Sequence, residues 1–77
     1  GDIFVEITSE KIGCILEVKY AENGALESKR GEALEQIIRK KYDQRLRMEG
    51  MQVIHAFGVA CYKKSCKVAY QRLPESL

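Results

Sequence analysis

The chain has 77 residues, with 13 basic and 11 acidic side chains and a formal net charge of +2 at pH 7. This mild, mixed charge excludes a polybasic tail, and no apolar run has the length of a membrane span or the pattern of a secretion signal. A domain of this size buries only roughly 60% of its unfolded surface. We therefore expect one small domain, cytoplasmic by default and without membrane contact, whose single sheet and covering helix are only marginally stable.

Two apolar stretches joined by a polar turn open the chain. Residues 3–7 and 12–20 have the composition of strands, and residues 8–11 form the turn between them. A two-residue loop at the centre of that turn makes the numbers of every cross-strand pair sum to 19. This register places Asp2 directly opposite Glu17.

Successive side chains of a strand point to opposite faces, so this register sorts the hairpin into two sets. One set is almost purely apolar and consists of Ile3, Val5, Ile7, Ile12, Cys14, Leu16 and Val18. The other set contains Asp2, Phe4, Glu6, Ile15, Glu17 and Lys19. A slip by one residue would mix the sets, so the pattern favours the register, and Cys14 is expected to be a small core residue.

Asp2 and Glu17 would repel each other across the strands unless a divalent cation lay between them. Lys19 follows Glu17 by two residues and projects on the same face. Carboxylate oxygens suit Mg²⁺ or Mn²⁺, and such a cation with a nearby ammonium is suited to cleaving a phosphodiester. The alternative is a solvated strand face with an incidental Glu-x-Lys pair, and the residues alone leave both interpretations open.

The middle of the chain is predicted to be one helix over residues 28–48, because it is rich in good helix formers. Six of its residues recur at the spacing of a buried stripe: Ala33, Leu34, Ile37, Ile38, Tyr42 and Leu46. Gly50 is a suitable stop, preceded by arginines that favour the negative end of the helix dipole.

A third strand is predicted over residues 51–60, parallel to the second and reached by a right-handed crossover. A turn at residues 62–65 then leads into an antiparallel edge strand over residues 66–72. The predicted class is α+β, a mixed sheet of β-β-α-β-β order with one helix on one face and the other face uncovered.

Cysteine and basic residues offer weaker indications. Four residues separate Cys61 from Cys66, and zinc would need closer pairs and a fourth ligand, so we do not expect a zinc site. His55 is expected to be a packed or edge residue. Five basic residues of the helix could contact phosphates or simply be solvated: Arg39, Lys40, Lys41, Arg45 and Arg47.

The ordered segments GDIFVEI, GCILEVKY, ALEQIIRKKY and VIHAFGVACYKKSCKVAY resemble the PD-(D/E)XK nuclease superfamily. More narrowly, they resemble the domain found C-terminal to an AAA-type ATPase-like domain in uncharacterised bacterial proteins. The resemblance runs from Asp2 to about Tyr70 and rests on the order of the segments, since none is specific alone.

The resemblance implies a restriction-endonuclease-like core that lacks its first helix, a truncated domain over residues 1–77 with its core at about 2–72. It implies that Asp2 and Glu17 bind Mg²⁺ or Mn²⁺, with the Val18 backbone carbonyl as a further ligand. Lys19 becomes the catalytic lysine, and Gln36 an auxiliary helix residue that points at Glu17 and Lys19. The implied substrate is nucleic acid, more narrowly DNA.

Two parts of the family pattern are missing, namely the opening helix that often supplies another acid and the proline of the motif. A catalytically inactive module of the same fold, which binds nucleic acid or proteins beside an ATPase-like domain, is therefore the alternative. A homodimer formed through the uncovered sheet face is compatible with either function.

Overall fold

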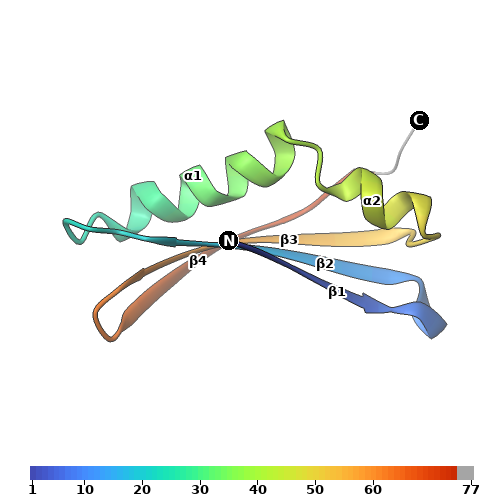
Figure 1. The fold of residues 1–77 in the computed structure, drawn as a ribbon, viewed down its shortest axis with the longest axis horizontal. Coiled ribbons are helices and arrows are strands. Elements are labelled where there is room, and N and C mark those ends of the chain that lie inside the picture. The colour runs from blue at the N-terminus through green and yellow to red at the C-terminus, as the bar shows by residue number, and fades with distance from the viewer. Residues whose placement is uncertain (75–77) are drawn as a thin grey trace.

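The computed structural model describes residues 1–74. The elements in chain order are β1 (Asp2–Ile7), the 3-10 turn η1 (Thr8–Glu10), β2 (Ile12–Tyr20), α1 (Leu26–Arg39), α2 (Asp43–Met48), β3 (Val53–Tyr62) and β4 (Ser65–Arg72). The four strands form one sheet in the order β1-β2-β3-β4, and both helices lie on the same side of it (Figure 1). The α+β class is confirmed, with a second short helix added. Neither helix within residues 1–74 is long and apolar enough to cross a membrane.

The pairing of the strands follows the prediction throughout. β1 is antiparallel to β2, β2 is parallel to β3, and β4 returns as an antiparallel edge strand. Asp2 pairs with Glu17 and Ile7 with Ile12, so the hairpin register is confirmed. The turn differs, because residues 8–11 form a 3-10 turn closed by Lys11 in the left-handed conformation at φ 56°. The four-residue loop closes on the same pairs as the expected two-residue loop, and the register is unchanged.

The single predicted helix is interrupted after Arg39. Lys41 has a φ of 55°, which ends α1, and the Tyr42 amide donates to the Ile37 carbonyl at 3.3 Å before α2 begins. Arg39, Lys40 and Lys41 are good helix formers, so helix propensity gives no stop signal at the end of α1. The break allows Leu46 of α2 to reach the sheet and become fully buried. Gly50, at φ 93°, follows α2 as expected.

The core lies between the helices and the sheet, and small residues on the sheet let the helices approach closely. A Cβ atom on Gly58 of β3 would lie 2.4 Å from the Arg30 carbonyl oxygen and 2.4 Å from the Leu34 nitrogen. The backbone of α1 therefore rests on β3 at this residue. A Cβ on Gly13 would likewise lie 2.7 Å from the Leu46 side chain of α2.

Half of the predicted helix stripe is fully buried, Leu34 and Tyr42 are partly buried, and Ile38 is exposed. Ala33, Ile37 and Leu46 are fully buried, whereas Ile38 is 42% exposed and was wrongly assigned to the core. Ile38 directly follows Ile37, so it points about 100° away from the sheet-facing direction.

The helices cover the mixed face of the hairpin and leave the apolar face open. Ile15 and Glu17 are buried beneath α1 and α2, while Ile3 and Val5 on the other face are 51% and 45% exposed. Figure 1 shows both helices on one side of the sheet, and no element of residues 1–74 lies against the other side. The expectation that Cys14 is a core residue was wrong, because Cys14 is half-buried on this open face.

Candidate metal centre

The Asp2–Glu17 pair lies at the open end of the hairpin, away from the turn. Gly1 and Val18 exchange two backbone hydrogen bonds, of 3.1 Å from the Gly1 nitrogen and 2.9 Å from the Val18 nitrogen. The next pair in an antiparallel ladder is a non-hydrogen-bonded one, with Cα atoms about 4.5 Å apart and side chains on one face. The two carboxylates therefore share the most closely spaced kind of cross-strand pair.

The two members of the pair have different environments. Asp2 is exposed, whereas Glu17 is only 2% exposed and lies beneath α1. A buried carboxylate needs hydrogen bonds or an opposite charge to offset the loss of its hydration. Glu17 has such a hydrogen bond, since Gln36 donates from Nε2 to Oε1 at 2.6 Å, and the Gly1 nitrogen lies 3.2 Å from Oε2.

Gln36 is held where α1 ends and the chain turns into α2. Its Nε2 also lies 3.4 Å from the Tyr42 hydroxyl, and the Tyr42 ring packs edge-on against Phe4 with centroids 6.1 Å apart. The Arg45 guanidinium lies 4.6 Å above the Phe4 ring. The structure therefore places Gln36 against Glu17, and it adds three neighbours that sequence reasoning did not assign to the site.

The contact between Gln36 and Tyr42 could not be read from helical spacing. Six residues separate them, and in an unbroken helix such a pair points about 120° apart. The interruption at Lys41 brings the Tyr42 hydroxyl back toward Gln36. Phe4 did carry a signal, because it shares the alternation of Asp2 on β1.

Lys19 extends the same face of β2 beyond Glu17. It is half-buried, pairs in register with Ala60, and its Cα lies about 7 Å from that of Glu17, the spacing of same-face residues on one strand. Among the ion pairs formed by residues 1–74, none includes the Lys19 ammonium. The side chain is therefore available to a group that approaches Asp2 and Glu17.

Two of the predicted metal ligands lie close together. The Gly1 nitrogen is 3.2 Å from Glu17 Oε2 and 3.1 Å from the Val18 carbonyl oxygen. Residues 1–74 contain no cluster of three or more His, Cys, Asp or Glu side chains suited to a metal. The predicted donors are two carboxylates and one carbonyl, an all-oxygen set of the kind that Mg²⁺ prefers together with several waters.

The family model of the PD-(D/E)XK nuclease superfamily matches residues 1–71. The chain belongs to the PD-(D/E)XK nuclease superfamily. Membership implies a nuclease-type function on a nucleic-acid substrate, and nucleases of this superfamily generally use divalent metals. No curated protein and no solved structure is significantly similar to the chain.

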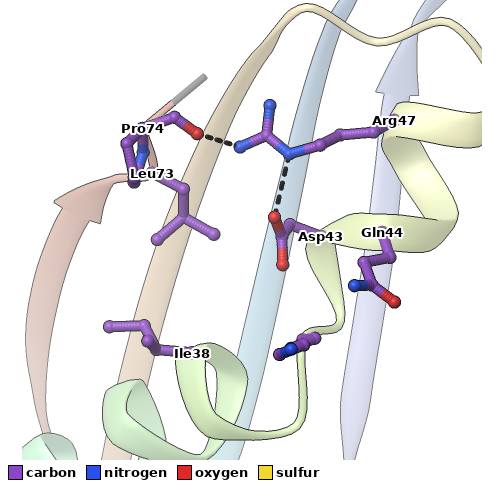
Figure 2. Close-up of a pocket in the computed structure, with 7 residues that line it drawn as sticks. Ile38, Asp43, Gln44, Arg47, Leu73 and Pro74 are labelled. Carbon is purple, nitrogen blue, oxygen red and sulfur yellow. Dashed lines mark hydrogen bonds and ion pairs between the residues drawn. The ribbon is translucent and has the colours of Figure 1, made fainter. Parts of the chain in front are cut away.

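A separate pocket of about 300 Å³ lies between α1, α2 and the end of β4 and contains none of the predicted nuclease residues (Figure 2). Its lining is Ile38, Lys41, Asp43, Gln44, Arg47, Leu73 and Pro74. In Figure 2 Arg47 bridges the pocket, since it donates to Asp43 at 2.9 Å and also to the Pro74 carbonyl. The predicted basic group is therefore divided: Lys41 and Arg47 face this pocket, whereas Arg45 lies over Phe4, on the strand that carries Asp2.

Proposed function

We propose that this PD-(D/E)XK domain hydrolyses phosphodiester bonds of DNA with Mg²⁺ or Mn²⁺. Asp2, Glu17 and the Val18 carbonyl would hold the cation, and Lys19 would act on the reacting phosphate. The observation that carries the proposal is the non-hydrogen-bonded Asp2–Glu17 pair with Lys19 on the same face of the sheet.

The cation, when bound, would lower the pKa of a coordinated water and offset the charge of the phosphate. Lys19 would donate hydrogen bonds to the nucleophile or to the phosphate oxygens, where charge accumulates in the transition state. Gln36 would be a positioning residue, because its amide holds Glu17 Oε1 and leaves Oε2, which lies beside the Gly1 nitrogen, without a bond to the helix.

The substrate would reach these residues from the β1 edge, where Asp2 is exposed. Arg45 lies over Phe4 on this side, and Arg39 is exposed one helical turn beyond Gln36. Both guanidinium groups are suited to phosphate contacts.

Metal binding is tested by titrating Mg²⁺ into the protein and following backbone amide resonances. We expect saturable shifts centred on Asp2, Glu17 and Val18, which Glu17→Gln and Asp2→Asn abolish. Glu6→Gln is the matched control, because Glu6 has the same strand and face as Asp2 but pairs with Gly13. Equal shifts in all variants, or none in the parent, would contradict the metal site.

Catalysis is tested separately by DNA cleavage with Mg²⁺ or Mn²⁺. We expect Lys19→Ala to lower the rate by about 100- to 1000-fold, the usual loss on removing a transition-state donor, while the metal-dependent shifts persist. Lys19→Arg would retain little of the parent activity, since a planar guanidinium does not replace a compact ammonium. Metal binding without cleavage of DNA or RNA would favour the inactive module.

Two proposals concern partners. The first is that this domain has an ATPase-like domain as its partner in the same full-length chain. The other is a homodimer formed through the open sheet face, whose apolar side chains lack a covering element within residues 1–74. Four strands of about eight residues cover on the order of 500 Å² of flat sheet. The accessible surface of the face is larger than this flat area, because it follows the contours of the side chains. It approaches the roughly 800 Å² that each partner buries in a stable interface.

A further inference from the structure

Cys61 and Cys66 face each other across the β3–β4 hairpin, on the open side of the sheet. They are register partners, one pair before the Tyr62–Ser65 pair that closes the two-residue loop. Their Sγ atoms are 2.7 Å apart. This pair has no part in the proposed nuclease chemistry, since Glu17 and Gln36 lie on the opposite, helix-covered side.

The backbone already meets the requirement for a covalent bond between them. Opposed residues of an antiparallel ladder have Cα atoms about 4.5 or 5.5 Å apart, and disulfides accept about 4.4–6.8 Å. Small side-chain rotations therefore suffice, and no strand has to move. By contrast Cys14 pairs with His55, six residues before Cys61 along β3 and thus about 20 Å away.

The two thiols differ in accessibility. Cys66 lies on the edge strand and is exposed, whereas Cys61 is half-buried on β3. The hydrogen bond with Cys66 raises the pKa of the Cys61 thiol above its ordinary value. Cys66 is therefore the thiol that a small oxidant meets first.

We propose that Cys61 and Cys66 form a reversible intramolecular disulfide by exchange with a low-molecular-weight disulfide such as oxidised glutathione. The Cys66 thiolate attacks one sulfur of the small disulfide and releases one thiol. The Cys61 thiolate then attacks the Cys66 sulfur of the mixed disulfide and releases the second thiol. Two protein thiols are oxidised, one small disulfide is reduced, and the two protein protons end on the released thiols.

The disulfide would cross-link β3 to the edge strand β4, one residue pair from the loop that joins them. Tyr62, next to Cys61, packs against Tyr20 with ring centroids 5.9 Å apart, and the Cys61 carbonyl accepts from the Ala21 amide at 2.8 Å. β4 is otherwise tied to α1 by the Lys67–Glu27 pair and by Arg30, which donates to the Val68 carbonyl. Oxidation would add a covalent tie to this edge strand.

The test exposes the folded protein to oxidised glutathione, blocks remaining thiols with N-ethylmaleimide and measures the intact mass. We expect the protein to lose two hydrogens through the disulfide and to gain one N-ethylmaleimide, on Cys14. Dithiothreitol should restore the reduced state. Cys14→Ser is the matched control and would form the same bond with no maleimide added. Cys61→Ser and Cys66→Ser would instead keep a glutathione adduct or a free thiol.

Three results would overturn the proposal. These are a stable glutathione adduct on Cys66 of the parent protein, a bond that includes Cys14, and disulfide-linked dimers as the main product. Each is distinguished by peptide mapping after proteolysis. None of these outcomes bears on metal binding or DNA cleavage, so failure here leaves the proposed function untouched.

Discussion

Glu17 is a buried carboxylate whose two oxygens have different partners. The Gln36 amide holds Oε1, and the Gly1 ammonium lies against Oε2. Within residues 1–74 no buried side-chain nitrogen or oxygen lacks a hydrogen bond. The neutral amide thus fixes the orientation of the carboxylate without competing for the charge that a cation would neutralise.

We predict that Gln36→Ala destabilises the fold by about 1–3 kcal/mol, because one oxygen of buried Glu17 then loses its donor. Urea unfolding measures the change. Glu35→Ala is the matched control, since Glu35 precedes Gln36 on α1 but is exposed. Equal stabilities of the two variants would mean that the Gln36 hydrogen bond is unimportant to the fold.

At the scale of elements, direct backbone contact between α1 and β3 positions the site. Gly58 is the register partner of Glu17, and α1 rests on it at Arg30 and Leu34. Any side chain at this residue would lift the helix, and Gln36, two residues beyond Leu34, would move away from Glu17.

We predict that Gly58→Ala costs about 1–3 kcal/mol or more, because its methyl group would overlap helix backbone that cannot rotate away. Gly31→Ala in the same helix meets no atom within 4 Å and should stabilise the fold by about 0.5–1 kcal/mol. Thermal and urea unfolding give both changes. Opposite signs are expected, and a neutral Gly58→Ala would refute the contact.

An ion pair joins β4 to α1, and its contribution to stability depends on pH. The Lys67 ammonium donates a 3.0 Å hydrogen bond to Glu27 and lowers the pKa of that carboxyl, with a smaller effect from Arg30. A lowered pKa means that the stabilisation is present at neutral pH and is lost as pH falls below the ordinary carboxyl range. We predict that Lys67→Ala raises the Glu27 pKa toward its ordinary value, measured by NMR titration. An unchanged pKa would show that the pair does not persist in solution.

At the scale of the whole molecule, one face of the sheet is apolar and open. Its exposed side chains extend across both edge strands, from Val5 on β1 to Val68 on β4. A chain of this size buries little apolar surface while one face of its sheet stays uncovered. Covering that face is therefore the main source of further stability.

We predict that the protein dimerises through this face in a concentration-dependent way, measured by sedimentation equilibrium. Val5→Lys and Val68→Lys should each shift the protein toward monomer, because a charge would be buried in an apolar interface. Met48→Lys is the control, since Met48 is 88% exposed on α2, away from the face. A parent protein that stays monomeric at all concentrations would refute the homodimer.

The hairpin shows how much local pattern can specify. Alternation of apolar and polar residues sufficed for the Asp2–Glu17 register, even though the turn was assigned the wrong conformation. Register survives such an error because a one-residue slip would exchange the faces of every side chain. The parallel β2–β3 pairing followed from chain order, since a strand–helix–strand connection of this length returns in parallel.

The sequence by itself therefore determined the strands, their pairing and the shared face of Asp2, Glu17 and Lys19, because these depend on spacing along one or two strands. Only the tertiary structure decided which face the helices cover. The helix-covered face contains Gly13 and Gly58, where a Cβ atom would collide with atoms of a helix, so this face admits helices at close range although the other face of the hairpin is more hydrophobic. The break at Lys41 and the Gln36–Tyr42 contact were likewise decided by packing against the sheet, since no local propensity marks them.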